Sequence, residues 1–169
     1  MKFILETPRL LLREFEITDA ESFFQLNNDP EVVRYTGDVA FKNIDEAKAL
    51  IENYVPYQKY GYGRWSVILQ ETDELIGWCG LKFQEDTKLI DLGYRFFKKH
   101  WNNGYATEAA RACVEYGFQK LGMTEIMARA MKENIASIEV MKKIGMTYWK
   151  DGEGHEEPAV YYRIEKHND

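Results

Sequence analysis

Residues 106–121 constrain the fold of this chain more than any other part of its sequence. Small and apolar residues recur there at helical spacing: Ala106, Ala109, Ala110, Cys113, Val114, Gly117, Phe118 and Leu121. Glu108, Arg111 and Glu115 fall outside this stripe, and Gly122 follows it, as is typical of a residue that ends a helix. The pattern predicts an amphipathic helix that lies on a core built by other elements.

Segments with strand-like composition lie on both sides of this helix. Three of them, joined by short polar turns, are expected to be antiparallel neighbours: Arg64 to Gln70, Leu75 to Phe83 and Lys88 to Phe97. The segments after the helix predict a strand, a second helix and two short strands around an acidic loop: Glu125 to Met131, Ala136 to Ile144, Thr147 to Lys150 and Ala159 to Ile164.

The N-terminal part predicts one strand and two helices. Leu10 to Phe15 has the composition of a strand. Two capping-box patterns are expected to begin the helices, Thr18 with Glu21 and Asn43 with Glu46. The second helix is expected to extend through Tyr54 and Val55 and to end at Pro56.

Together these elements predict an α/β fold, with a mixed, mostly antiparallel sheet and helices on both faces. The 169 residues, 45% of them hydrophobic, are enough for one core and favour a single domain over residues 1–169. Cys79 and Cys113 lie in apolar surroundings without clustered histidines, so we expect buried free thiols and no metal site.

Charge and hydropathy exclude several classes of partner. The 22 Lys and Arg against 28 Asp and Glu give a net charge of −6, which disfavours binding to a nucleic-acid backbone. An acidic surface attracts cationic amines, but it is more often an ordinary feature of soluble proteins. Neither a signal peptide nor an apolar run long enough to cross a bilayer is visible, so the sequence predicts a cytoplasmic protein without membrane contact.

The turn before the strongest helix has the features of an anion site. Segment 101–108 joins an apolar strand to the helix N-terminus, where backbone amides and the positive end of the helix dipole converge. Gly104 can adopt a left-handed conformation and allow a phosphate to approach the backbone, and Ala106 keeps the next turn narrow. The segment lacks the signatures of a P-loop and of a dinucleotide fingerprint, and by itself it also fits a tight turn with an ordinary cap.

This loop and several other motifs resemble the GNAT acetyltransferases. Gly-x-Ala within Trp-x-x-Gly-Tyr-Ala-Thr-Glu-Ala is similar to the pyrophosphate loop of that superfamily, usually Gln/Arg-x-x-Gly-x-Gly/Ala. The other motifs follow the order seen in the branch that includes the ribosomal-protein alanine N-acetyltransferases: Thr7 to Arg13 with Asp19-Ala20, Asp29 to Val32, Leu75 to Gly77 with Gly80-Leu81, Asp91 to Tyr94, and Asn134 to Ser137 followed by Lys143 to Met146. The resemblance implies a GNAT-like sheet of about six to seven strands.

The resemblance also implies an activity: direct transfer of an acetyl group from acetyl-coenzyme A, as cosubstrate, to a primary amine without a metal. The coenzyme A pyrophosphate would bind backbone amides of Asn102, Asn103, Gly104, Tyr105, Ala106 and Thr107. The pantetheine arm would pair with the strand end at Tyr94, Arg95 and Phe96. Asn134 would bond to that arm, and Ser137 would lie near the thioester sulfur; the alternatives are a helix-entry residue and a solvated first-turn residue.

The sequence departs from the family at the expected general acid. Many members carry a Tyr seven residues after the Asn, where it protonates the leaving thiolate, and this chain has Met141. Ser137 or a bound water must take over that role, or the thiolate leaves unassisted. Trp101 also replaces the Gln or Arg that usually begins the loop motif.

Asp91 is the best candidate for the base that deprotonates the incoming amine. It occupies the position just before Gly93-Tyr94 where relatives often carry a Glu, although an alternating strand could equally point it to solvent or give it a structural role. Glu108 is expected to be a first-turn residue that the helix dipole favours, and His100 to be a surface loop residue.

The acceptor is expected to be a small-molecule or peptide amine: a protein N-terminus, an amino acid, a polyamine or an aminoglycoside. An aromatic cluster could contribute to its site, although core packing explains most of it: Tyr54, Tyr57, Tyr60, Tyr62 and Trp65. The competing interpretation is a sensor module that binds acyl-coenzyme A with little catalysis. The sequence does not decide the oligomeric state, and a homodimer stays open.

Overall fold

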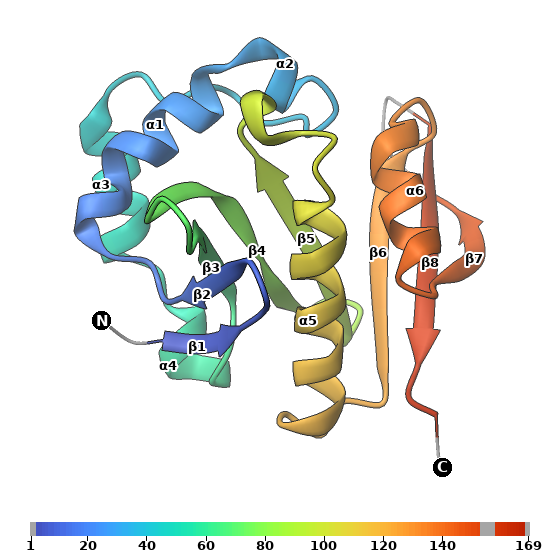
Figure 1. Cartoon of the computed structure of the whole chain (residues 1–169). Helices are drawn as coiled ribbons and strands as arrows, with labels where there is room; N and C mark the ends of the chain where they lie inside the picture. The colour runs from blue at the N-terminus through green and yellow to red at the C-terminus, as the bar shows by residue number, and fades with distance from the viewer. Residues whose placement is uncertain (1–2, 153–157, 168–169) are drawn as a thin grey trace.

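The computed structural model describes residues 3–152 and 158–167, so residues 153–157 of the predicted acidic loop lie outside it. One sheet of eight strands, in the order β1-β2-β3-β4-β5-β6-β8-β7, spans the molecule (Figure 1). Only β5 and β6 run parallel; every other neighbouring pair is antiparallel. The strands are β1 (Phe3–Glu6), β2 (Leu10–Arg13), β3 (Arg64–Leu69), β4 (Glu74–Gln84), β5 (Leu89–Phe96), β6 (Glu125–Met131), β7 (Thr147–Asp151) and β8 (Ala159–Glu165).

The predicted mixed, mostly antiparallel sheet is confirmed, but it has one strand more than the expected six to seven. The additional strand is β1, whose four residues show no clear alternation of polar and apolar side chains. Pairing with β2, with Leu5 opposite Leu12, extends it as an edge strand. A segment this short is defined by its partner and not by its own sequence.

Helices cover both faces of the sheet. They are α1 (Ala20–Asn28), α2 (Pro30–Val33), α3 (Ile44–Glu52), α4 (Pro56–Tyr60), α5 (Tyr105–Gln119) and α6 (Ile135–Lys143), with single 3-10 turns at Ile17–Asp19 and Lys98–His100. Trp78 packs with α1 and α3, whereas its neighbour Cys79 belongs to the larger core under α5. Because successive strand residues point to opposite faces, α1 and α3 lie on one face of the sheet and α5 lies on the other.

The first of the two N-terminal helices begins differently from the prediction, and the second begins as predicted. A capping box of Glu16 and Asp19 begins the 3-10 turn Ile17–Asp19 that leads into α1, in place of the expected Thr18 and Glu21. Asp19 is buried and accepts two hydrogen bonds from Arg13. The next helix begins as predicted, with Asn43 Oδ1 accepting from the amide of Glu46.

The end of α3 is also corrected. This helix stops at Glu52, so Tyr54 and Val55 lie outside it. Pro56 does not terminate a helix but begins the short α4, in agreement with the preference of proline for the first helical turn.

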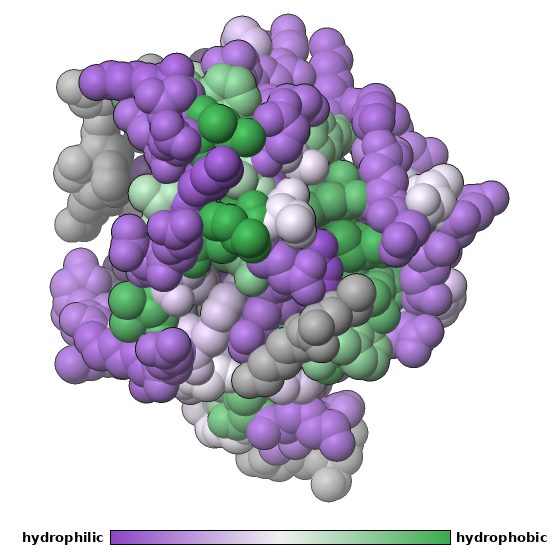
Figure 2. Space-filling model, turned by 90° about the vertical axis from the view of Figure 1, so that its left-hand side faces the viewer, coloured by the Kyte–Doolittle hydropathy of each residue, from purple (hydrophilic) through white to green (hydrophobic). Residues whose placement is uncertain are grey.

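The polarity of the surface and the state of the two cysteines agree with the predictions from the sequence. The face that carries α1 and α3 is mostly hydrophilic, with scattered apolar areas (Figure 2). Within the described residues, no helix has the length and apolarity needed to cross a membrane. Cys79 and Cys113 are fully buried free thiols with their sulfur atoms 3.7 Å apart, as predicted, and burial raises the pKa of the Cys113 thiol.

The junction between β5 and β6 interrupts the hydrogen bonding of the sheet. These two strands pair at one position only, where Asp91 lies opposite Met127. Beyond Asp91 the backbone edge of β5 has no partner in β6. The sheet therefore consists of two parts, β1–β5 and β6–β8, that meet at this point.

Candidate active site

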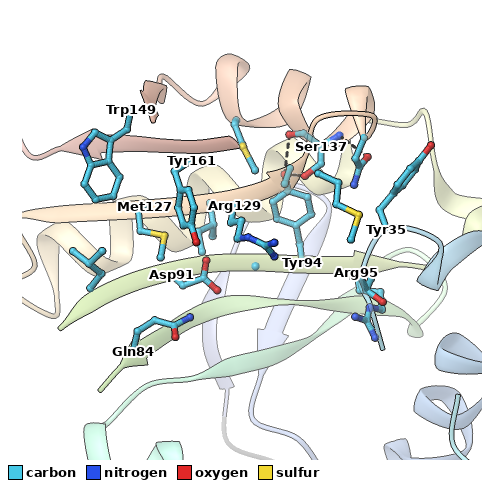
Figure 3. A pocket seen from close by; sticks show the side chains of 18 of the residues that line it. Tyr35, Gln84, Asp91, Tyr94, Arg95, Met127, Arg129, Ser137, Trp149 and Tyr161 are labelled. Atoms are coloured by element: carbon cyan, nitrogen blue, oxygen red, sulfur yellow. Dashed lines mark hydrogen bonds between the residues drawn. The ribbon is translucent and has the colours of Figure 1, made fainter. Parts of the chain in front are cut away.

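A cavity of about 540 Å³ lies at the junction between β5 and β6 (Figure 3). Side chains of both faces of the sheet line it: Tyr94, Asn134 and Ser137 on the side of α6, and Arg64, Asp91 and Arg129 on the opposite side. The cavity thus connects the two faces of the sheet, and two ligands can approach it from different directions.

The structure brings part of the predicted site together in this cavity. Asp91, Tyr94, Arg95, Asn134 and Ser137 line it. Phe96 belongs to the hydrophobic core instead. The predicted anion loop at residues 102–107 lies outside the cavity and borders, through Gly104 and Thr107, a second hollow of about 570 Å³.

The anion loop presents six backbone amides without a protein acceptor. In the described chain, none of the N–H groups of residues 102–107 donates to a protein acceptor, and the first helical bond of α5 runs from the amide of Glu108 to the carbonyl of Gly104. Asn102 and Gly104 have positive φ angles of 65° and 80°, which turn the chain sharply into the helix. Amides gathered at the positive end of a 15-residue helix are the usual protein site for a phosphate group.

Hydrogen bonds from other elements hold this loop in place. Trp101 Nε1 donates to the carbonyl of Phe96 at 2.9 Å, which ties the loop to the end of β5. Arg9 Nη1 donates to the carbonyl of Asn103, and Arg9 Nε donates to Glu108 Oε1 at 2.8 Å. The residue that replaces the usual Gln or Arg of the family, Trp101, therefore has a structural role in positioning the loop.

Glu108 anchors the β1–β2 turn to α5. Its carboxylate accepts from Thr7 Oγ1 and from both the amide and the side chain of Arg9. Burial alone would raise the pKa of Glu108, but the hydrogen bonds from Thr7 and Arg9 outweigh it and leave the pKa below its ordinary value. His100 lies beside Glu74, with 3.1 Å between Nε2 and Oε2, and does not line the cavity.

Asn134, Ser137 and Tyr94 form one connected group on the α6 side of the cavity. Asn134 Oδ1 caps α6 by accepting from the amide of Ser137, so the helix-entry role is real, while its Nδ2 has no acceptor in the described chain. Ser137 Oγ lies 2.8 Å from the hydroxyl of Tyr94, which also donates to the Ser137 carbonyl (Figure 3). Burial raises the pKa of Tyr94, so the phenol keeps its proton at neutral pH.

The sequence did not predict a role for the Tyr94 side chain. It assigned only the backbone of Tyr94 to the coenzyme. It noted that Met141 occupies the position where many relatives carry the tyrosine that acts as general acid. Met141 is fully buried and can donate no proton. The only signal for Tyr94 was a polar hydroxyl near the C-terminal end of a strand.

Asp91 does not point to solvent, because its side chain lies in the cavity with an exposed fraction of 16%. Arg64 Nη2 donates to Asp91 Oδ2 at 2.7 Å, and Arg64 Nη1 donates to the backbone carbonyls of Asp91 and Gly80. The guanidinium lies directly over Gly93, where a Cβ atom would come within 2.6 Å of it. Asp91 Oδ1 accepts no hydrogen bond from the described chain.

The predicted aromatic cluster does not line the cavity, but it positions Arg64. Tyr54 accepts from the amide of Arg64 at 2.7 Å, and Tyr57 donates to its carbonyl. The aromatic walls of the cavity come from four residues that the sequence analysis did not single out: Tyr35, Trp78, Trp149 and Tyr161. Within residues 3–152 and 158–167, no cluster of three or more metal-ligating side chains is present.

Comparison with known proteins identifies the family. The family model described as "Acetyltransferase (GNAT) domain" matches residues 9–147. The chain belongs to the GNAT acetyltransferase family. It is 33% identical over 150 residues to the "Uncharacterized N-acetyltransferase p20" of Bacillus licheniformis, covering 88% of this chain and 83% of that relative.

Solved structures agree with this assignment. A GNAT-family acetyltransferase of Bacillus anthracis has a TM-score of 0.81 to this acetyltransferase at 30% identity, covering 96% of this chain and 98% of the other. The ribosomal L7/L12 α-N-protein acetyltransferase RimL, solved in complex with coenzyme A, has the same fold with a TM-score of 0.81 at 15% identity, covering 97% and 98%. The resemblance drawn from the motifs is confirmed.

Proposed function

We propose that this acetyltransferase transfers the acetyl group of acetyl-coenzyme A directly to a primary amine of a small molecule or peptide. The observation that carries the proposal is the cavity at the β5–β6 junction, which places Asp91 on one face of the sheet and the Tyr94–Ser137 pair on the other. A candidate proton acceptor on one side of the cavity and candidate proton donors on the other suit a reaction between two ligands that approach from opposite faces of the sheet.

The residues present fit coenzyme A. The six amides of residues 102–107 without protein acceptors supply a site for its pyrophosphate, and the edge of β5 beyond Asp91 supplies backbone partners for the pantetheine arm. Asn134 Nδ2 is free to donate to the same arm. Acetyl-coenzyme A, when bound, supplies the acetyl group as an activated thioester. The coenzyme-binding solved relative RimL supports this assignment.

Asp91 is placed to accept the proton of the incoming amine. Arg64 holds one carboxylate oxygen of this cavity-lining residue, which leaves Oδ1 without a hydrogen-bond partner in the described chain. The amine nitrogen bonds to the acetyl carbon as the carbon–sulfur bond breaks, and the proton that the nitrogen loses passes to Asp91. On the other side, Ser137 Oγ donates its proton to the departing sulfur as it takes up one from the Tyr94 hydroxyl, solvent reprotonates Tyr94, and coenzyme A leaves as the thiol.

Turnover separates this function from a sensor that binds acyl-coenzyme A without catalysis. We expect release of free thiol from acetyl-coenzyme A in the presence of a panel of amines, because relatives are named N-acetyltransferases and the cavity contains candidate groups for both proton transfers. Binding of coenzyme A without thiol release by any amine would contradict the proposal. A cytoplasmic location is part of it, since buried free thiols suit a reducing compartment.

Asp91→Asn tests the proposed base. The amide can still accept from Arg64, so we expect a loss of kcat of about 10² or more with little change in coenzyme affinity. The control is Asp86→Asn, which removes a carboxylate from the same cavity but leaves the Arg64 ion pair intact. Full activity of Asp91→Asn would leave Asp91 with a structural role only.

A further inference from the structure

Arg129 is a cation without a partner in the described chain. It lies in the middle of β6, and its Nε atom is buried without a hydrogen-bond acceptor. Its guanidinium forms no ion pair or hydrogen bond with any residue of the ranges 3–152 and 158–167. Arg129 extends from β6 toward β5, into the space between Asp91 and Tyr94 (Figure 3).

Arg129 is partly buried, and an unpaired guanidinium whose Nε atom is fully buried needs a physical reason. Burying a charged group without a compensating acceptor costs free energy, and buried arginines are therefore normally paired. The other two arginines of this cavity follow the rule: Arg64 pairs with Asp91, and Arg95 pairs with Asp38 at 2.5 Å. No described residue supplies an acceptor for Arg129, which leaves its guanidinium available to an anionic ligand.

Lys150 adds a second cation near Arg129. Both residues lie opposite Tyr161, Arg129 across the β6–β8 pair and Lys150 across the β7–β8 pair. The Lys150 ammonium lies 4.4 Å from the ring centroid of Trp149 and 5.4 Å from that of Tyr161, and it too forms no ion pair among the described residues. Two cations beside one aromatic wall thus lack an anionic partner within residues 3–152 and 158–167.

The charge of the cavity is opposite to that of the whole chain. Among the described residues that line it, four are cationic, Arg64, Arg95, Arg129 and Lys150, whereas only Asp86 and Asp91 are anionic. The chain as a whole carries a net charge of −6. A cavity that selects for polycations would have the reverse arrangement, because like charges repel at short distance.

The coenzyme phosphates do not explain Arg129. The amides that suit a pyrophosphate lie at the start of α5, outside this cavity. Arg129 lies on the same face of the sheet as Asp91, since Asp91 pairs with Met127 and residues two apart on a strand share a face. That face is the side of the proposed base, so the anion belongs to the acceptor.

We propose that Arg129, assisted by Lys150, binds a carboxylate of the acceptor, so that the acceptor is a small molecule carrying both an amine and a carboxylate, of the amino-acid type. The inference rests on the proposed function for the amine and adds the substrate class. Arg129 lies two residues beyond Met127, which is roughly 7 Å along β6 from the level of Asp91. One small ligand can therefore contact the side chains of both Asp91 and Arg129. A guanidinium is well suited to bidentate binding of a carboxylate.

Matched pairs of acceptors test the substrate class. Each amino acid is compared with the amine that lacks its carboxylate, and polyamines and amino-acid amides are included. We expect kcat/KM for the carboxylated member to exceed that of its partner by at least about tenfold, the scale of one lost charge-assisted hydrogen bond. A polyamine as the best acceptor, or equal rates within the pairs, would overturn the inference while leaving acetyl transfer to an amine in place.

Variants assign the preference to Arg129. Arg129→Gln should lower kcat/KM for carboxylated acceptors at least about tenfold and leave the carboxylate-free partners unchanged, and Arg129→Lys should retain part of the preference. Lys120→Gln, an exposed residue just after α5, is the control for the same change in net charge. An equal effect of Arg129→Gln on both members of a pair would show that Arg129 does not bind the carboxylate.

A binding measurement keeps the inference testable if no amine is acetylated. Calorimetry of the protein saturated with coenzyme A should show binding of carboxylated amines that Arg129→Gln loses. Absence of such binding in the unaltered protein would overturn the carboxylate site. Absence of turnover together with intact, Arg129-dependent binding would contradict the proposed function alone.

Discussion

Gly104→Ala is the most informative single change in the anion loop. Gly104 precedes α5 with φ at 80°, a left-handed conformation that costs an alanine about 1–2 kcal/mol. The space itself is permissive, because a Cβ atom there would lie 3.4 Å from Arg9 Nη2, an ordinary contact. The substitution therefore strains the backbone without creating a clash.

The same strain can be placed where no ligand is expected. Gly122 also has a positive φ, of 69°, and a Cβ atom there would meet no atom within 4 Å. Both variants should lose about 1–2 kcal/mol of stability, which corresponds to a fall in melting temperature of roughly 2–8 °C for a chain of this length. They form a matched pair for stability.

The two variants should differ in coenzyme binding. Relaxing the strain at residue 104 turns one or more of the loop amides away from the pyrophosphate, and a hydrogen bond to a charged group contributes about 1.5–3 kcal/mol. Calorimetry with coenzyme A should therefore show about a 10- to 150-fold weaker affinity for Gly104→Ala and an unchanged affinity for Gly122→Ala. Equal affinities in two folded variants would refute the assignment of the loop.

Two further predictions concern Asn134 and Glu108. Asn134→Asp keeps the cap of α6 but removes the Nδ2 donor, so coenzyme affinity should fall by about 1–2 kcal/mol with little change in melting temperature. Asn134→Ala should lower both the coenzyme affinity and the melting temperature. Unchanged affinity of the Asp variant would leave Asn134 as a cap only. Glu108 has a folded-state pKa below its usual 4.5, so it stabilises the fold above that pH and loses this contribution as the pH falls through the lowered pKa. Glu108→Gln should therefore be less stable than the unaltered chain near neutral pH in urea denaturation, and the difference should disappear in acid; a constant difference would contradict this.

The sequence predicted the elements whose pattern is local. The helix α5 and the sharp turn before it could be predicted because the stripe of residues 106–121 and the glycine at 104 carry their own signals. The segment Glu125 to Met131 agrees with β6 over its whole length. In contrast, β1 and the capping box of Glu16 and Asp19 depend on partners elsewhere in the fold.

The chemistry of the cavity depends on contacts that sequence spacing does not reveal. The ion pair of Arg64 and Asp91 joins β3 to β5 across β4, and Gly93 provides its space. The hydrogen bond of Tyr94 to Ser137 spans 43 residues. One signal was available: Arg129 is the only charge in the interior of the segment EIMARAM, and a strand next to a parallel neighbour is usually buried on both faces.

The single pairing position of β5 and β6 has a consequence for how this protein is stabilised. Strand edges normally lie at the periphery of a sheet, but here two edges face each other inside the molecule. Under the proposed function, the amide groups of the pantetheine arm act as a short piece of strand against β5, so that cosubstrate binding and sheet formation use the same hydrogen bonds. At a concentration 100 times the Kd, such a ligand raises the free energy of unfolding by about 2.7 kcal/mol. The supply of acetyl-coenzyme A would then control not only the rate of the enzyme but also how firmly its two half-sheets hold together.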